Sequence, residues 1–229
     1  KEINYSFIRQ WIVHLSEKKF SKVSINRKIA SLKSYFNFLV NIGELNSSPL
    51  KAHKNLKSSS KVVIPFSETE IDKVFEGFQF SDGNDRDKLI IELFYSTGIR
   101  RDELLNIKII NIDFDNHLVK ILGKRNKERI IPMLPKLSKS ILNYISKYSP
   151  VEYLFESKKS KQLSSSTVYR IINKYFRAVS SKVKVSPHVL RHTFATHMLN
   201  NGADINTIKE ILGHSSLSST QIYTKIKLP

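Results

Sequence analysis
Residues 186–223, SPHVLRHTFATHMLNNGADINTIKEILGHSSLSSTQIY, form the stretch around which the rest of the chain is organised. Ser186 and Pro187 are typical of a helix start, because a hydroxyl can cap the free amides and proline fits the first helical position. Gly202 is expected to end this helix, and Gly213 to end a second helix that follows. The stretch therefore predicts two short helices joined by tight turns.

Four side chains of this stretch suit phosphate chemistry: His188, Arg191, His214 and Tyr223. His188 and Arg191 are three residues apart, so they project from the same helical face. His214 directly follows a helix-ending glycine, and Tyr223 comes nine residues later. Taken singly, such a histidine usually packs or faces solvent, and such a tyrosine usually packs its ring. Together they lie at helix starts and turns, where side chains can converge on one point.

The order H-x-x-R, L-G-H-S and Q-I-Y-T resembles the closing signature of the tyrosine recombinases, and SPHVLRHTFATHMLNNGADI is similar to the box of their Xer-type members. The resemblance implies that Tyr223 attacks the scissile phosphorus and forms a 3′-phosphotyrosine, which leaves a free 5′ hydroxyl. It assigns charge stabilisation to Arg191 and His214, and the removal of the tyrosine proton to His188. Because the phosphoester bond energy is retained, it implies neither ATP nor a cofactor.

A second box, T-G-I-R-R-D-E-L at 97–104, resembles the family's first arginine motif. The resemblance implies that Arg100 binds the scissile phosphate, a task that suits a planar guanidinium with two donors to offer. Glu103 shares the helical face of Arg100 and can fix its orientation by a charge-assisted hydrogen bond. The alternative reading is an ordinary surface ion pair of little energetic value.

A β-hairpin is predicted next, with strands at 117–122 and 129–133 joined by GKRNKE. The resemblance places the catalytic lysine on this hairpin, directly after a glycine, and so assigns protonation of the departing 5′ oxygen to Lys124. Arg125 stands where the family usually has a second glycine, and this difference leaves Lys127 as a rival general acid.

No metal site is expected. Acidic clusters of the two-metal kind are missing, and the histidines do not form the H-E-x-x-H pattern of zinc sites. His188 and His192 are four residues apart and could formally hold a metal, but Arg191 beside them favours phosphate. His192 and His197 are expected to serve packing or helix hydrogen bonds, as are Tyr169 and Tyr175 on a packing helix.

The net charge of +18 over 229 residues favours a polyanionic partner. Residues 1–64 hold 12 Lys and Arg against 3 Asp and Glu, so this part of the chain is far denser in positive charge than the rest. A generally lysine-rich proteome is the alternative explanation. Cysteine is absent, and no window reaches the roughly 20 apolar residues of a membrane span. A cytoplasmic protein with no membrane partner is therefore expected.

The N-terminal part is predicted to be helical at 3–19 and 23–42, with a third short helix around 50–56. It resembles the latter part of the small core-binding domain that precedes the catalytic domain in tyrosine recombinases, with the opening helix missing. Its second helix carries a basic side, predicted together with the hairpin to bind DNA. These DNA-binding candidates are Lys22, Arg27, Lys28, Lys33, Arg125 and Lys127.

Residues 51–61, KAHKNLKSSSK, have the composition of a linker. The predicted organisation is a helical domain at 1–57, the end of a linker at 58–64 and a catalytic domain at 65–229. The catalytic domain should open with a capping box of Ser67 and Glu70, and should continue with helices at 87–98, 135–148 and 164–182 and a short strand at 152–157. The fold class is thus mainly α with a small antiparallel sheet.

The leading functional prediction is a site-specific recombinase that acts on double-stranded DNA as a tetramer on paired sites, either to resolve chromosome dimers or to move a mobile element. A type IB topoisomerase-like relaxing enzyme shares the chemistry. A non-catalytic DNA-binding protein is a third alternative, although the principal catalytic positions are filled. Because Xer-type proteins usually continue into a C-terminal helix and this chain stops six residues after Tyr223, it is expected to be a piece of a longer protein.

Overall fold
The computed structural model describes residues 3–57, 63–78, 84–123, 128–157, 162–182 and 184–213. The chain divides into two compact units, Lys1–Val62 and Val63–Pro229. The described residues are mostly helical and contain one three-stranded antiparallel sheet, which confirms the predicted fold class. The finer boundaries at 57 and 64 stay a prediction, and residues 58–62 of the linker lie outside the described ranges.

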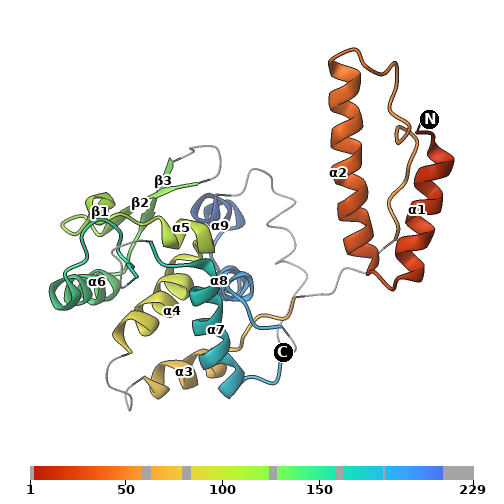
Figure 1. The fold of residues 1–229 in the computed structure, drawn as a ribbon. Coiled ribbons are helices and arrows are strands. Elements are labelled where there is room, and N and C mark those ends of the chain that lie inside the picture. Colours follow the sequence, from red (N-terminus) through yellow and green to blue (C-terminus); the bar gives the residue numbers. More distant parts are fainter. Residues whose placement is uncertain are drawn as a thin grey trace. The chain divides into compact units, whose positions relative to one another are not determined.

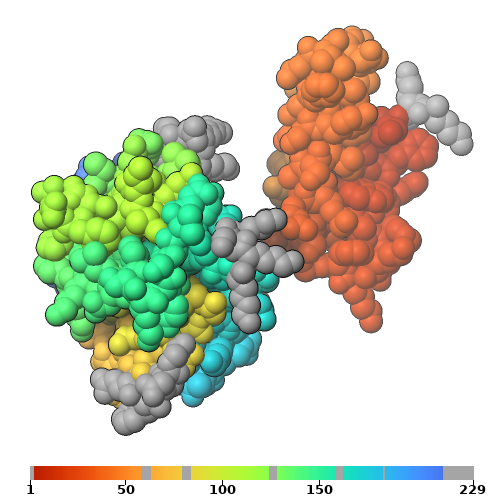
Figure 2. All heavy atoms as spheres, turned by 60° about the vertical axis from the view of Figure 1, so that its left-hand side comes forward, coloured from red at the N-terminus to blue at the C-terminus, as the bar shows by residue number. Residues whose placement is uncertain are grey.

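The first unit contains two helices, α1 (Tyr5–Glu17) and α2 (Lys22–Asn41) (Figure 1). The Asn4 side chain caps the first helix and the Ser21 hydroxyl caps the second, each accepting from a backbone N–H. In the space-filling view the red atoms of α1 and the orange atoms of α2 meet in one body (Figure 2). Their shared core is apolar and consists of Ile8, Ile12, Leu15, Ile25, Ile29, Phe36 and Leu50.

The third helix predicted around 50–56 is wrong, because this segment is a turn followed by residues without regular secondary structure. Leu50 is fully buried in the core of the first unit. The Asn26 side chain accepts a hydrogen bond from the backbone N–H of Leu56 and donates one to its carbonyl, both at 2.9 Å. A side-chain amide thus satisfies the peptide groups that a helix would have paired, so no helical turn is needed.

The second unit is built mainly of helices. Their bounds are α3 (Glu68–Gly77), α4 (Asp85–Thr97), α5 (Arg101–Leu105), α6 (Pro135–Tyr148), α7 (Ser165–Val179), α8 (Pro187–Asn200) and α9 (Ile205–Leu212), with a 3-10 turn at Ile109–Asn111. The predicted capping box is present at the start of α3, where Ser67 and Glu70 bond reciprocally to each other's backbone N–H. The other predicted helices of this unit agree with the structure to within a few residues at their ends.

The sheet has the order β1 (Ile112–Asp113), β2 (Leu118–Leu122) and β3 (Glu128–Pro132), with both pairings antiparallel. The predicted hairpin corresponds to β2 and β3. The short strand expected at 152–157 is wrong, because this segment makes only isolated bridges, from Tyr153 to Lys108 and from Glu156 to Gln162. Isolated bridges of one residue pair each do not add a strand to the sheet.

Helix α8 is the centre of the second unit and packs against α4, α7 and α9 (Figure 1). The polar residues in its middle, from Arg191 to His197, are buried. Thr193 accepts a hydrogen bond from the N–H of Phe66 at 2.9 Å, and a ring nitrogen of His197 bonds the Phe66 carbonyl at 2.9 Å. Burial lowers the pKa of His192 to about 4, so this side chain is neutral at physiological pH. Both histidines therefore have the packing roles expected from the sequence.

Across the described part of the chain, no helix combines the length and apolar character that crossing a membrane would require.

Candidate active site
The turn between α4 and α5 contains a glycine at a position where any side chain would be strained. Gly98 has a φ of +59°, and a Cβ added there would lie 2.3 Å from the Phe194 ring and 2.8 Å from the Leu212 side chain. The missing side chain lets α4 end directly against α8 and α9. Arg100 follows two residues later, at the start of α5.

Arg100 is tied to Glu103 through both its backbone and its side chain. The Arg100 N–H donates to Glu103 Oε2 at 2.7 Å, and Nη1 donates to Glu103 Oε1 at 2.8 Å. The expected bond between these two residues is present, but it is no surface pair, since the Glu103 side chain is only 4% exposed. The Arg100 side chain is 41% exposed, so its guanidinium is oriented by the buried Glu103 and remains accessible to solvent.

A second arginine, Arg129 of β3, also binds Glu103, and the sequence did not predict it. Its Nη1 and Nη2 donate to the two carboxylate oxygens at 2.7 and 2.8 Å, in the fork-to-fork geometry that favours strong pairs. Its Nε donates to the carbonyl of Ile211 at 2.9 Å. The available sequence signal was that Arg129 shares a strand face with Ile131, which is buried.

The Glu103 carboxylate is charged at every pH at which the protein would work. Burial alone would raise its pKa, but the hydrogen bonds and charge of Arg129, the backbone N–H of Arg100 and the Arg100 side chain outweigh burial and lower it to about 2. Two guanidiniums thus share one buried anion.

Arg191, on α8, is 4% exposed and spans two segments of the chain. Its Nη1 donates to the carbonyl of Gly98 at 2.6 Å, and its Nη2 donates to the carbonyl of Leu212 at 2.7 Å. It therefore joins the end of α4 to the end of α9.

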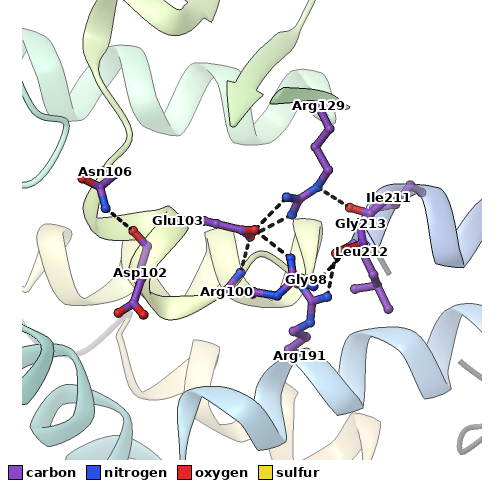
Figure 3. A network of polar contacts seen from close by, with 10 residues as sticks. All are labelled: Gly98, Arg100, Asp102, Glu103, Asn106, Arg129, Arg191, Ile211, Leu212 and Gly213. Atoms are coloured by element: carbon purple, nitrogen blue, oxygen red, sulfur yellow. Dashed lines mark hydrogen bonds and ion pairs between the residues drawn. The ribbon is translucent and has the colours of Figure 1, made fainter. Parts of the chain in front are cut away.

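The last carbonyls of α9 are bound by three different arginines (Figure 3). Ile211 accepts from Arg129, Leu212 accepts from Arg191, and Gly213 accepts from Arg100 Nη2 at 3.0 Å. These carbonyls are the negative end of the helix dipole and have no partner within the helix. We call Arg100, Arg129 and Arg191, together with Glu103, the arginine cluster.

A pocket of ≈ 410 Å³ opens beside the arginine cluster. Its lining residues are Ile99, Arg100, Arg101, Tyr169, Ser186, Pro187, His188 and Arg191. The structure thus brings His188 and Arg191 together with Arg100, which lies far from both in sequence. Desolvation, together with the positive charges of Lys184 and Arg191, lowers the pKa of His188 below its ordinary value of 6.5, so its ring is neutral near pH 7.

Tyr169 corrects one expectation from the sequence. It lies on α7 as predicted, but it is 48% exposed and lines the pocket instead of packing in the core. Tyr175, in contrast, stacks on Phe78 with ring centroids 4.4 Å apart, as expected of a packing residue. Tyr169 therefore has to be tested as a nucleophile beside the predicted Tyr223.

Five of the predicted residues lie outside the described ranges. They are Lys124, Arg125, Lys127, His214 and Tyr223. Two described residues close to these gaps, Gly213 and Arg129, bond to the arginine cluster or belong to it. The carbonyl of Gly213, bound by Arg100, belongs to the peptide bond that leads into His214. Arg129 is the second residue of β3 after the gap that holds both candidate lysines.

The predicted DNA-binding residues of α2 are all exposed, and we call Lys22, Arg27, Lys28 and Lys33 the basic face of α2. The ammonium group of Lys28 lies 5.4 Å from the centroid of the Phe20 ring. Within the residues that the structure describes, no group of three or more His, Asp or Glu side chains is arranged to hold a metal ion.

Two sequence profiles match the chain. Residues 65–228 match the phage integrase family, and residues 1–43 match the N-terminal SAM-like domain of phage integrases. Among curated relatives, a tyrosine recombinase of Pseudothermotoga lettingae is 37% identical and covers 99% of this chain and 79% of its own. The tyrosine recombinase XerC of Syntrophus aciditrophicus is 34% identical over 100% of this chain and 77% of the relative.

Solved structures agree with these matches. The crystal structure of XerA recombinase is 31% identical, with a TM-score of 0.65 over 99% of this chain and 79% of that one. XerH site-specific recombinase bound to palindromic difH substrate, in a post-cleavage complex, has a TM-score of 0.81 at 21% identity and covers 98% of this chain and 69% of its own. At that identity the second likeness concerns the fold alone.

Proposed function
The chain belongs to the phage integrase family, whose members include the tyrosine recombinases, and is a DNA strand-exchange enzyme of that family; we propose that Tyr223 is its nucleophile and that Arg100 and Arg191 of the arginine cluster bind the scissile phosphate. In this proposal the phenolic oxygen of Tyr223 attacks phosphorus, a tyrosine–phosphorus bond forms, and the bond to the 5′ oxygen breaks. Attack by the 5′ hydroxyl of another strand reverses the step, so DNA is rejoined without an added energy source.

The observation that supports this proposal best is the convergence of Arg100 and Arg191 on one pocket. They come from different helices, and each is oriented by bonds to fixed protein oxygens. A phosphodiester that gains a fifth oxygen also gains charge on its non-bridging oxygens. Donors that are already oriented can stabilise this charge without reorganising as it develops. His214, which follows the bound carbonyl of Gly213, is proposed as a third donor.

The proton transfers fall to His188 and to a lysine of the hairpin. A neutral imidazole can accept the proton of the attacking tyrosine, and the lowered pKa of His188 favours that form near pH 7. We propose Lys124 as the acid that protonates the departing 5′ oxygen, with Lys127 as the rival. Both lysines precede β3 in the sequence by a few residues, and Arg129 of that strand belongs to the cluster.

The proposed substrate is duplex DNA, and the proposed assembly is a tetramer on paired sites. The net charge of +18 suits a polyanion, and the basic face of α2 offers exposed cations for its phosphates. The cellular task is either the resolution of chromosome dimers or the movement of a mobile element. Because these substrates are chromosomal or mobile DNA, we propose that the protein acts in the cytoplasm.

The covalent adduct is the test of this proposal. Wild-type protein incubated with a nicked suicide substrate in EDTA should give a protein–DNA species that survives SDS. Tyr223→Phe removes one hydroxyl without changing charge, so it should abolish the adduct and leave gel-shift affinity nearly unchanged.

Tyr169→Phe is the matched control, because Tyr169 is the tyrosine that lines the pocket in the described part of the chain. It should still form the adduct. An adduct that persists in Tyr223→Phe but disappears in Tyr169→Phe would move the nucleophile to α7. An adduct that needs a divalent metal would contradict the proposed mechanism.

A further inference from the structure
The Arg129 guanidinium is bonded to the protein more completely than that of Arg100, one of the two arginines assigned to the phosphate. Each of its three nitrogen atoms donates to a protein oxygen, two on Glu103 and one on Ile211. Its side chain is 14% exposed, against 41% for Arg100. Its Cδ would lie only 3.1 Å from a Cβ added at Gly213, so it also packs closely against the end of α9. Arg100 and Arg191 line the pocket and Arg129 does not, so Arg129 is placed to hold other residues and not the substrate.

The partners of Arg129 are the groups that position the predicted catalytic residues. Glu103 also binds Arg100, and Ile211 precedes by one residue the carbonyl that binds Arg191. Figure 3 shows this guanidinium reaching from the strand above to Glu103 on one side and to the end of α9 on the other. A single side chain thus connects the hairpin, α5 and α9.

The charges of the arginine cluster give Arg129 a second effect. Glu103 divides its negative charge between two guanidiniums, and the four side chains together carry three positive charges and one negative. Without Arg129, the whole carboxylate charge would be balanced by Arg100. That guanidinium would then be held more strongly by the protein and would offer less positive potential to a phosphate.

We infer that Arg129 is a positioning residue for strand cleavage, which holds Glu103 and the end of α9 so that Arg100 and Arg191 face the scissile phosphate with their full charge. This inference rests on the proposed function and extends it to a residue outside the assigned catalytic set.

The test compares Arg129→Gln with Arg86→Gln in single-turnover cleavage of a suicide substrate. Arg86 is a matched control, because it also pairs with a carboxylate, that of Asp87, but lies at the start of α4 and outside the pocket. Arg129→Gln should lower the cleavage rate constant about 100-fold, the cost expected when catalytic groups are misplaced by about 1 Å. Arg86→Gln should cleave at the wild-type rate. Arg129→Lys, which keeps the charge and loses the fork, should fall between wild type and Arg129→Gln.

A substrate with a methylphosphonate at the cleavage site separates positioning of the phosphate ligands from a general loss of structure. This group is neutral and needs less positive charge in the transition state. The ratio of the methylphosphonate rate to the phosphate rate should therefore be higher in Arg129→Gln than in wild type. Poor folding would lower both rates together and leave their ratio unchanged.

Three results would overturn the inference. The first two are a wild-type cleavage rate in Arg129→Gln, and a lowered rate with an unchanged ratio of methylphosphonate to phosphate rates. The third is rescue of Arg129→Gln by a substrate with a 5′-bridging sulfur, because Arg129 would then act on the lysine that protonates the leaving oxygen. Absence of an adduct in the wild-type protein is a different outcome, because it would reject the proposed function itself.

Discussion
The basic face of α2 and the arginine cluster hold positive charge in two different ways. The four cations of α2 are exposed at the end of long side chains on a helix surface. The arginines of the cluster donate to a buried carboxylate and to helix-end carbonyls at 2.6–3.0 Å. The first arrangement leaves the charges exposed to water, whereas the second fixes their direction.

This difference separates two tasks in DNA strand exchange. Exposed surface charge attracts a polyanion over a distance, and salt screens that attraction. Fixed charge in a protected pocket stabilises a transition state, because no rearrangement is needed as charge develops. We therefore expect substitutions in the cluster to change rates and protein stability, and substitutions on α2 to change affinity.

The largest effect is expected from Arg191→Gln. This change removes a proposed phosphate ligand and also releases the carbonyls of Gly98 and Leu212, which are buried. Loss of one preoriented donor should lower single-turnover adduct formation by about 10²–10³-fold. The free energy of unfolding should also fall by about 1–3 kcal/mol for a carbonyl left unpaired. A cleavage rate constant within a few-fold of the wild-type value would contradict the distinction between the hydrogen-bonded charges of the cluster and the exposed charges of α2.

The next effect concerns stability and pH at Glu103. Its pKa is about 2 in the folded protein against an ordinary 4.5, so the carboxylate stabilises the fold above pH 4.5. That contribution is lost as the pH falls from 4.5 towards 2. Glu103→Gln should lower the free energy of unfolding of the second unit by about 3 kcal/mol at pH 7, and the difference from wild type should shrink through that window.

Denaturant unfolding can follow this prediction with a control inside the same molecule. The single tryptophan, Trp11, packs on the core of the first unit. Its fluorescence should report the same transition in wild type and Glu103→Gln, while far-UV circular dichroism detects the weakened second unit. A stability difference that stays constant down to pH 2 would mean that Glu103 does not act through its charge.

The smallest effect is expected on α2. Replacing both Lys28 and Lys33 with glutamine should weaken DNA binding and reduce the slope of log affinity against log salt by about two, one for each lost phosphate contact. The free energy of unfolding should change by no more than about 0.5 kcal/mol, because both side chains are exposed. Titrations by fluorescence anisotropy at several salt concentrations measure the slope, and an unchanged slope would remove α2 from the DNA interface.

The sequence predicted those parts of the site that depend on local spacing. The bond between Arg100 and Glu103 follows from a separation of three residues, and the start of α8 follows from Ser186 and Pro187. The link from Arg129 to Glu103 joins residues 26 apart on a strand and a helix, and no local pattern encodes it.

Two other features depended on tertiary packing in the same way. Leu50 is buried in the core of the first unit without a helix, and the side chain of Asn26 satisfies the backbone of Leu56, thirty residues away in sequence. Tyr169 lies on the predicted helix, yet the periodicity did not indicate that its ring borders the pocket. Helix patterns identify the apolar face well, but the exposed residues that line a site are fixed by neighbouring segments.

The most direct test of the account removes one positive charge from each region by the same substitution. Arg100→Gln and Lys33→Gln are compared with wild type in DNA affinity and in the cleavage rate constant at saturating protein. The account predicts that Arg100→Gln lowers the saturated rate by about 10²-fold or more with nearly unchanged affinity. It predicts that Lys33→Gln lowers affinity and leaves the saturated rate unchanged. Equal losses of saturated rate in the two variants, or a wild-type rate in Arg100→Gln, would contradict it.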